Sequence, residues 1–290
     1  MSSIDLRPFG NTGKNVTRVG LGGEGVLRTY GRTKEAVAVI KEAISRDITY
    51  FDSANAYSGS EGYYGAYWSE HPDIRKNIFQ TSKSARRDYG GAMAELDNTL
   101  RTMGIDHLDL WQIHDVRTEE DIEELEGPGG ALDAFIDAKK SGKIKHIGVT
   151  GHHDPDIITY TIENWPVDSV LLPVNPVEGV LGGFLDETLT AAHEKGIAVV
   201  GMKVLGASYY ISKKNGITPE LLIRYALSRD ITLAIVGCSS PAEVRTLANA
   251  GGEFTPMSDE EQIDLEDRFR PAAKKLAYYR GVIKQEPAMF

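Results

Sequence analysis

Short apolar runs rich in β-branched residues recur along the chain, and each is followed by a longer stretch with helical spacing. The alternation repeats about every 30 to 40 residues, which is typical of βα units. Eight parallel strands in one chain of this length favour a closed (β/α)8 barrel of the TIM type over an open sheet. The eight runs lie at 16–23, 48–54, 77–83, 107–115, 143–151, 168–176, 197–206 and 231–240.

Helical spacing predicts helices between the runs, and threonines stand at two of the expected starts. Thr33 and Thr218 are the predicted N-caps, and Pro219 then takes the first helical position, where its missing N–H costs nothing. The segment after Ser258 predicts an extra helix that closes one end of the barrel. We therefore expect one α/β domain over residues 1–290, with a helical tail at about 258–290. The predicted helices include 34–46, 93–103, 132–141, 185–194 and 219–228.

An open nucleotide-binding sheet is the alternative fold. Its G-x-G-x-x-G fingerprint is present in "GLGGEGVL" only if Gly20, Gly22 and Gly25 are taken as the three glycines. No acidic residue ends a second strand about 20 residues later in that register, where such a sheet needs one. The barrel is therefore the preferred fold.

Composition narrows the class of protein. The 290 residues are 41% hydrophobic and 26% charged, a globular balance. A formal charge of −10 argues against nucleic acid as the main partner. The N-terminus has no apolar signal region, and no segment approaches the roughly 20 apolar residues of a membrane span. We expect a soluble, cytoplasmic protein.

The single cysteine, Cys238, limits the redox chemistry that the chain can support. One thiol permits no internal disulfide, no thiolate metal cage and no iron–sulfur cluster. Any redox reaction must then use a bound organic cofactor.

Ionisable residues end three consecutive apolar runs. Asp52 ends the second run and Tyr57 follows it, Lys83 ends the third, and His114 ends the fourth. Each alone fits a structural role, as a turn, core or surface residue. Barrel enzymes build their sites at the carboxyl ends of the strands, and neighbouring strands lie about 5 Å apart. The four side chains are therefore expected to converge on one rim.

Their chemistry suits the reduction of a carbonyl. A tyrosine with a pKa near 10 is a weak acid, but an ammonium within about 4 to 6 Å favours the phenolate, and Lys83 is the candidate for that role. Asp52 supplies the counter-charge that a buried lysine needs. His114 adds a neutral donor for a carbonyl oxygen. Tyr57 would then protonate the oxygen while a hydride reaches the carbon.

These four residues, in this order and spacing, resemble the aldo-keto reductase family, in its prokaryotic branch with a Met-Lys seventh strand. "FGNTGKNVTRVGLGG", "LDNTLRTMGIDHLDLWQIHD" and "AFIDAKKSGKIKHIGVTGHH" resemble further segments of the family, so the likeness covers nearly the whole chain. It implies a (β/α)8 reductase that binds a nicotinamide dinucleotide across the barrel mouth. Carried over, Tyr57 is the general acid/base, Lys83 and Asp52 are its tuning pair, and His114 orients the substrate carbonyl.

The same resemblance implies a set of cofactor-binding residues. Thr150 and Gly151 stand where the family holds the nicotinamide carboxamide, with His152 as the substitute for an absent amide side chain. Asn175 is the nearest amide to the glutamine usual in strand six. A thioether packs well on a ring face, and a lysine can reach the pyrophosphate. The seventh-strand candidates are Met202, Lys203 and Leu205.

The adenosine end is expected after the eighth run. Gly237 allows close backbone approach, and Ser239 and Ser240 at a helix start suit phosphate. Glu243 stands where NADP-binding members carry arginine or lysine, and its carboxylate would repel a 2′-phosphate; Arg245 follows two residues on. We expect NADP(H), with NAD(H) as the alternative.

Two other functions remain as alternatives. The cluster His152, His153 and Asp154 suggests a metal-dependent barrel hydrolase, but the paired His-x-His of such enzymes is missing from the first run, so we expect no metal. A nicotinamide-binding, redox-sensing subunit with little turnover is the second alternative. Glu24 either lines the substrate mouth or is a solvated loop residue. The expected substrate is a small aldehyde or ketone; its identity, the direction of reaction and the oligomeric state stay open.

Overall fold

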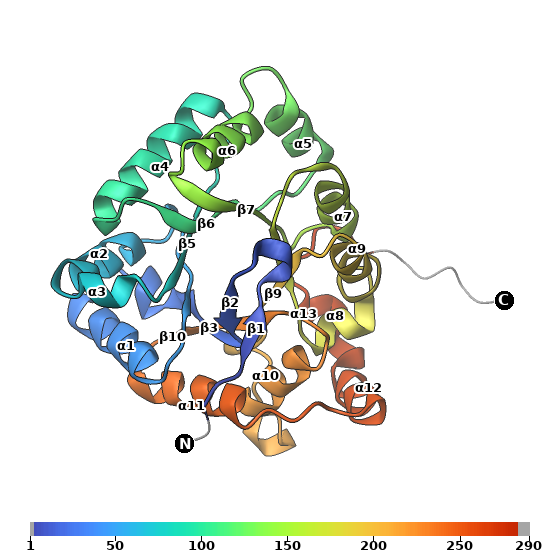
Figure 1. Cartoon of the computed structure of the whole chain (residues 1–290). Helices are drawn as coiled ribbons and strands as arrows, with labels where there is room; N and C mark the ends of the chain where they lie inside the picture. The colour runs from blue at the N-terminus through green and yellow to red at the C-terminus, as the bar shows by residue number, and fades with distance from the viewer. Residues whose placement is uncertain (1–2, 284–290) are drawn as a thin grey trace.

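Eight parallel strands close on themselves to form a barrel (Figure 1). The computed structural model describes residues 3–283. Around the barrel the strand order is β10, β3, β4, β5, β6, β7, β8 and β9, and β10 pairs with both β3 and β9. Each predicted run overlaps one barrel strand, which confirms the (β/α)8 fold. The strands are β3 (Val19–Gly25), β4 (Tyr50–Phe51), β5 (Phe79–Ser84), β6 (Leu108–Ile113), β7 (Ile144–Thr150), β8 (Ser169–Pro173), β9 (Ala198–Met202) and β10 (Leu233–Cys238).

Helices surround the barrel as an outer layer (Figure 1). The α-helices are α1 (Thr33–Ser45), α2 (Ser60–Glu70), α3 (Pro72–Arg75), α4 (Tyr89–Met103), α5 (Glu119–Glu126), α6 (Ala131–Lys140), α7 (Pro155–Asn164), α8 (Pro176–Leu181), α9 (Leu189–Glu194), α10 (Pro219–Leu227), α11 (Pro241–Gly252), α12 (Asp259–Phe269) and α13 (Ala273–Leu276). Short helical turns complete the set: η1 (Gly10–Thr12), η2 (Val26–Arg28), η3 (Phe184–Thr188), η4 (Gly206–Ser208), η5 (Lys213–Asn215) and η6 (Arg270–Ala272).

The two predicted N-caps had different outcomes. The Thr218 side chain accepts a hydrogen bond from the Leu221 N–H and caps α10, as predicted. The prediction for Thr33 was wrong, because Thr33 is the first residue of α1 and Arg32 is its N-cap. The Arg32 carbonyl accepts a hydrogen bond from the Ala36 N–H at 2.8 Å, so the first helical turn begins one residue earlier than the threonine suggested.

A β-hairpin covers the amino end of the barrel. Strands β1 (Leu6–Pro8) and β2 (Asn15–Thr17) pair antiparallel, and the hairpin lies in front of the barrel in Figure 1. The fully buried Phe9 enters the barrel interior and packs 4.7 Å, between ring centroids, from Phe79. An aromatic plug at this end leaves the carboxyl end as the one available for a site.

Apolar side chains on both faces of the sheet form two layers of core. The outer layer lies between strands and helices and includes Trp111 stacked on Phe135. The inner layer fills the barrel and includes Leu110, Leu171 and Val200. Strands buried on both faces tend to be apolar along their whole length, which made most of the eight visible in the sequence; β5 is the exception, because its buried residues are mostly polar.

The C-terminal segment follows the outside of the barrel before it returns to the rim. The predicted helix after Ser258 is α12, and Ser258 caps it by accepting from the Glu261 N–H. It packs on α8 at the periphery (Figure 1), so the barrel end is closed by the hairpin and not by this helix. Residues Tyr278 to Arg280 then reach the carboxyl-end rim, where Tyr278 lines a cavity. The predicted tail extended to residue 290, and its last seven residues lie outside the described residues.

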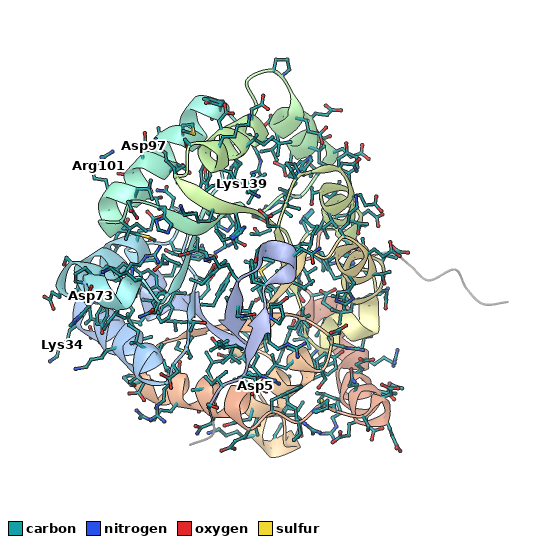
Figure 2. The ribbon with its side chains drawn as sticks, viewed as in Figure 1. Asp5, Lys34, Asp73, Asp97, Arg101 and Lys139 are labelled. Carbon is teal, nitrogen blue, oxygen red and sulfur yellow. The ribbon has the colours of Figure 1, made fainter. Side chains whose placement is uncertain are left out.

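Charged side chains cover the helical layer. Figure 2 shows Lys34, Asp73 and Arg101 at the periphery of the molecule, on α1, α3 and α4. Within residues 3–283, no helix combines the length and apolar character needed to cross a membrane.

Candidate active site

A cavity of about 970 Å³ opens at the carboxyl end of the barrel. Each of the eight strands, or the loop directly after it, contributes to its lining. All four residues predicted to converge on this rim line it: Asp52, Tyr57, Lys83 and His114.

Lys83 and Asp52 form a buried ion pair at the floor of the cavity. The Lys83 Nζ donates to both Asp52 carboxylate oxygens at 2.7 Å and to the Ser53 carbonyl at 2.7 Å. Thr81 Oγ1 donates to the same carboxylate at 3.0 Å. Both charged side chains are 1% exposed, so each charge is stabilised by the opposite charge of its partner instead of by water. Burial lowers the pKa of Lys83, and the Asp52 charge opposes that shift.

Tyr57 lies on the loop between β4 and α2, held close to the ion pair. Its N–H donates to the Ala54 carbonyl at 2.9 Å, which sets the turn. The Lys83 Nζ is 4.9 Å from the centre of the phenol ring. Gly23 makes room for that ring, because a Cβ at this position would come within 2.7 Å of it. The absence of a side chain at Gly23 is therefore a steric condition for the placement of Tyr57.

The sequence analysis expected Lys83 to lower the pKa of Tyr57, and the structure corrects this. Burial raises the pKa of Tyr57 well above its usual range, and the Asp52 and Glu24 carboxylates add to the rise. The Asp52 carboxylate offsets part of the charge of the Lys83 ammonium that it contacts, so the effect of burial on the pKa of the phenol outweighs the effect of the ammonium. Tyr57 is thus a neutral hydroxyl, the form that donates a proton.

His114 follows β6 and faces Tyr57 across the cavity. The two ring centroids are 5.7 Å apart with nearly perpendicular planes. Burial, assisted by the nearby Lys83 charge, lowers the pKa of His114 to about 3, so the imidazole is neutral. Its Nδ1 is enclosed and has no hydrogen-bond partner among the described residues. The other ring nitrogen, Nε2, is the one left to meet a ligand.

Most of the predicted cofactor residues also line the cavity. The Thr150 hydroxyl oxygen accepts a hydrogen bond from the Asp115 N–H at 2.8 Å, so its own hydrogen can be donated to a ligand. The predicted residues that line the cavity are Thr150, Met202, Lys203, Leu205, Gly237, Ser239 and Glu243.

Three predicted cofactor residues do not line the cavity. Asn175 is fully buried and is the N-cap of α8; its oxygen accepts from the Val177 and Glu178 N–H groups, and its amide nitrogen donates to the Tyr279 hydroxyl. A Cβ on Gly151 would meet Ile158, so that backbone is packed against α7. Ser240 caps α11 by accepting from the Glu243 N–H. All three have structural roles at the rim.

Lys203 is the free cation of the cavity. Within residues 3–283 no carboxylate forms an ion pair with it, and its nearest ring partner is Tyr279, 5.8 Å from Nζ to ring centre. Burial lowers the pKa of Lys203, while Glu24 and Asp115 oppose the shift. An ammonium without a counter-ion suits an anionic ligand such as a pyrophosphate.

At the end formed by residues that follow β10, the cavity lining carries an acid. Glu243 lines it and accepts a hydrogen bond from the Ser239 N–H at 2.7 Å. Arg245 is not among the lining residues, because its guanidinium turns to the α1 side and lies 3.4 Å from the Glu42 carboxylate. A phosphate at this end would therefore meet Glu243 without help from Arg245.

Sequence reasoning missed several charged residues of the cavity. Arg28, Asp115 and Arg117 line it, and Glu24, which was left undecided, lines it too. Asp115 directly follows His114, so the rule that site residues follow strand ends was sufficient to find it. Arg28 lies on η2, three residues beyond β3, and no sequence signal marked that turn.

The adjacent histidines that suggested a metal site have other contacts. His152 lies between Asp115 Oδ1, at 3.3 Å from its Nε2, and the Tyr279 carbonyl, at 3.2 Å from its Nδ1. The His153 carbonyl accepts from the Gly281 N–H at 3.0 Å. Among residues 3–283, no group of three His, Cys, Asp or Glu side chains has an arrangement that could hold a metal ion.

Known proteins resemble this chain in sequence and in fold. The model of the aldo/keto reductase family matches residues 18–218. L-galactose dehydrogenase of Arabidopsis thaliana is 25% identical over 329 aligned positions, which cover 97% of this chain and 99% of the relative. An aldo-keto reductase of Mycolicibacterium smegmatis is 30% identical over 229 positions, 74% of this chain and 77% of the relative.

Solved structures share the fold. The holo form of an aldo-keto reductase from Bacillus halodurans superposes with a TM-score of 0.75 at 19% identity, over 98% of this chain and 99% of that one. An aldo-keto reductase from Klebsiella pneumoniae in complex with NADPH gives a TM-score of 0.75 at 18% identity, over 98% and 99% of the two chains.

A closed (β/α)8 barrel with a tyrosine, a lysine, an aspartate and a histidine on its carboxyl rim defines a class of oxidoreductase. With the family match over residues 18–218, the chain belongs to the aldo/keto reductase family. It is an enzyme of that family.

Proposed function

We propose that this chain is an NADP(H)-dependent carbonyl reductase that interconverts a small aldehyde or ketone and the corresponding alcohol. The observation that carries the proposal is the arrangement of the rim: Tyr57 and His114, with ring centroids 5.7 Å apart, line one cavity together with a buried Lys83–Asp52 pair, and burial favours the neutral form of both rings. A proton donor and a neutral hydrogen-bond donor beside one another suit a carbonyl oxygen that gains negative charge.

The residues present fit a nicotinamide dinucleotide. The cavity lining includes Tyr57 and Glu243, and Lys203 offers it an ammonium that forms no ion pair with a carboxylate among residues 3–283. Thr150 keeps a donor for a carboxamide oxygen, and Met202 offers a thioether to a ring face. The Klebsiella pneumoniae neighbours, whose structures contain NADP or NADPH, support NADP(H) over NAD(H) as the first choice. When bound, the reduced nicotinamide supplies the hydride.

The chain's own residues handle the proton and the alignment. His114 holds the carbonyl oxygen through the N–H of its Nε2, and Tyr57 gives that oxygen a proton as the carbonyl carbon accepts the hydride. Lys83 lies 4.9 Å from the phenol ring and stabilises the phenolate that remains, while Asp52 holds the ammonium in place. In alcohol oxidation the same phenolate takes the proton back.

Tyr57→Phe tests the proton donor. The variant keeps the ring and removes the hydroxyl, so reduction of any accepted aldehyde should fall by about 10² to 10⁴-fold. NADPH binding, followed by fluorescence titration, should stay close to that of the unmodified protein. Tyr50→Phe is the matched control, because Tyr50 is buried in the barrel interior and does not line the cavity. Retained turnover in Tyr57→Phe would contradict the assignment.

Lys83→Met tests the tuning pair. It leaves Asp52 buried without its partner, so Asp52→Asn combined with Lys83→Met serves as the variant that removes both charges. Both should fold well enough to bind NADPH and lose most turnover near neutral pH. A normal rate in the double variant would show that the ion pair is structural only. Tight NADPH binding by the unmodified protein without turnover of any aldehyde would support a cofactor-sensing subunit instead.

A further inference from the structure

Arg87 lies outside the cavity lining and contacts the backbone of the segment that carries His114. It follows β5 on the loop that leads to α4. The Arg87 Nη1 donates to the His114 carbonyl at 3.0 Å, and its Nη2 donates to the Asp115 carbonyl at 2.9 Å. One planar guanidinium therefore holds two consecutive peptide groups next to the predicted carbonyl-orienting residue.

Asp121 holds the Arg87 guanidinium in place. Its Oδ1 accepts a hydrogen bond from Arg87 Nε at 2.7 Å, and the two side chains are 18% and 20% exposed. Its Oδ2 accepts from the Arg117 N–H at 2.8 Å, and together with Thr118 it forms the capping box at the start of α5. The start of α5 therefore fixes the direction from which Arg87 approaches the rim.

The N–H groups of the same segment bond to the barrel instead. The His114 N–H donates to the Ser84 carbonyl at 2.9 Å, at the end of β5. The Asp115 N–H donates to the Thr150 hydroxyl at 2.8 Å, at the end of β7. All four backbone polar groups of these two residues thus have partners: two strands accept from the N–H groups, and Arg87 donates to the carbonyls.

This arrangement includes an uncommon backbone conformation. Asp115 has a φ of 59°, in the left-handed region, directly after His114. A residue other than glycine pays about 1 to 3 kcal/mol for such a conformation, which persists only where its surroundings impose it. The hydrogen bonds from Arg87 to the two carbonyls and the bond to Thr150 are the contacts that impose it.

The direction of the His114 ring depends on the peptide groups on both sides of its Cα. Ser84 holds the group before it and Arg87 holds the group after it. We propose that Arg87 is a positioning residue for carbonyl reduction, which keeps the His114 ring directed at the substrate oxygen beside Tyr57. This inference rests on the proposed reductase function and adds a residue from outside the cavity to it.

A second arginine at the other end of β6 provides a matched control. The Arg75 Nη1 donates to the Ile78 carbonyl at 2.8 Å, its Nη2 donates to the His107 carbonyl at 3.1 Å, and the guanidinium lies 2.9 Å from the Asp109 carboxylate. The Arg75 side chain is 12% exposed. His107 directly precedes β6, whereas His114 directly follows it. The two arginines thus make the same kinds of contact at opposite ends of one strand.

Arg87→Met and Arg75→Met separate positioning from stability. Each removes a guanidinium from two carbonyls and an aspartate, so both should lower the free energy of unfolding, measured by chemical denaturation, by similar amounts. A misplacement of about 1 Å at a reacting group can cost about 10²-fold in rate. Arg87→Met alone should therefore lower kcat for NADPH-dependent reduction of aldehydes such as propanal or benzaldehyde, by about 10- to 100-fold.

Binding of the cofactor should not follow this loss of kcat. The Kd for NADPH, measured by fluorescence titration, should stay within about twofold in Arg87→Met, because an interaction made only in the transition state leaves ground-state binding unchanged. In Arg75→Met both kcat and Kd should stay within about twofold of the values for the unmodified protein.

Arg87→Lys keeps a positive charge beside Asp121 but replaces the planar fork by a single ammonium. This variant should recover most of the stability that Arg87→Met loses and only part of its kcat. It also serves as the test variant if Arg87→Met fails to fold, since the comparison with Arg75→Met then uses a folded protein.

A combination with His114→Ala shows whether Arg87 acts through the histidine. Without the imidazole nothing remains to be directed, so Arg87→Met should lower the residual kcat of His114→Ala by less than about threefold. Sites that act independently would instead give the same loss in both backgrounds.

The outcomes distinguish the inference from the function on which it rests. A loss of kcat that is confined to the Arg87 variants and disappears in His114→Ala supports the inference. Equal kcat in Arg87→Met and Arg75→Met, a full kcat in Arg87→Lys, or equal losses in the two backgrounds would overturn it while the reductase function stands. No turnover of these aldehydes by the unmodified protein with NADPH or NADH would overturn the reductase function and the role of Arg87 with it.

Discussion

At the scale of single residues, burial decides which proton each group at the site carries. Tyr57 and His114 are both enclosed at the barrel rim, and loss of water disfavours the phenolate of one and the imidazolium of the other. Lys83 is buried too, but the contact of its ammonium with the Asp52 carboxylate at 2.7 Å stabilises its charge. One physical cause therefore leaves two neutral donors and one paired cation, a set suited to an oxygen that gains charge.

The pH profile of carbonyl reduction should reflect these charge states. The pKa of His114 is about 3, so its imidazole stays neutral throughout the range from pH 5 to 8. The pKa of Tyr57 is raised, so its hydroxyl keeps its proton up to at least about pH 10. We expect kcat/KM for the aldehyde to be level between pH 5 and 9.

A rate that changes with an apparent pKa near 6.5 and becomes level in His114→Gln would contradict the neutral imidazole. The measurement is a steady-state series in a constant-ionic-strength buffer. The stability of the unmodified protein at each pH is followed in parallel, because a base whose folded-state pKa is lowered destabilises the fold as the pH falls below its unfolded value.

Glu243 should set how strongly the 2′-phosphate of NADP(H) is accepted. Its carboxylate lines the cavity, whereas Arg245 is not among the lining residues and faces Glu42. Glu243→Gln removes a like charge, so NADPH should bind about three- to tenfold more tightly relative to NADH. Parallel fluorescence titrations measure the ratio, and Glu253→Gln, an exposed acid after the end of α11, is the control. A ratio that stays constant would place the 2′-phosphate away from Glu243.

At the scale of elements, the segment after α13 is fastened to the barrel by a buried ion pair. The Arg280 Nη1 lies 2.5 Å from Glu178 Oε2, and both side chains are essentially unexposed. Burial raises the pKa of Glu178, and the Arg280 charge opposes the shift. The same segment places Tyr278 in the cavity lining and the Tyr279 hydroxyl against Asn175. The start of α8 and the segment 278–280, which lie far apart in the sequence, are thereby joined at the rim.

Arg280→Met should destabilise the protein strongly, because it leaves the Glu178 carboxylate buried and unpaired. The expected loss in free energy of unfolding is about 3 to 5 kcal/mol, measured by chemical denaturation. The double variant with Glu178→Gln should recover much of the loss. Arg270→Met, which breaks an exposed pair with Asp267, should cost about 1 kcal/mol or less. Equal small effects of the two arginine variants would show that Arg280 is not a buried anchor.

The elements visible in the sequence were those with a local signal. All eight strands were predicted because most are buried apolar runs and because the runs alternate with helical spacing; the residues at the rim followed from where those runs end. The sequence analysis assigned no helix to 60–70, where glycines and aromatic residues in "SEGYYGAYWSE" obscure the amphipathic pattern of α2. The Glu178–Arg280 pair joins residues 102 positions apart, and no local pattern shows such a contact.

The role of a residue was harder to predict where the same side chain could either bind a ligand or stabilise the fold. Asn175 was chosen as an amide near the end of a strand, yet its amide caps α8 and bonds to the Tyr279 hydroxyl. The direction of the Tyr57 pKa shift was misjudged because the charge of Lys83 was considered without the burial of the phenol, which raises the pKa. Both differences depend on surroundings that only the folded chain creates.

At the scale of the whole molecule, the cavity belongs to the entire barrel. All eight strands or their following loops line it, so the cavity exists only when the whole barrel is closed. We propose that the chain unfolds as one domain, with the C-terminal helices included, because α12 and α13 pack on α8, which follows a barrel strand. A ligand that binds only the folded state then stabilises the whole chain and not one part of it.

Thermal unfolding with and without NADPH tests whether the chain unfolds as one domain. At a concentration about 100 times its Kd, a ligand adds about 2.7 kcal/mol to the stability of the folded state, which corresponds to a rise in Tm of about 5 °C for a domain of this size. Calorimetry should show a single transition that moves as a whole. Two transitions, of which only one responds to NADPH, would mean that part of the chain folds independently of the cavity. In Tyr57→Phe the same shift in Tm should persist, since that variant keeps the surfaces that bind the cofactor.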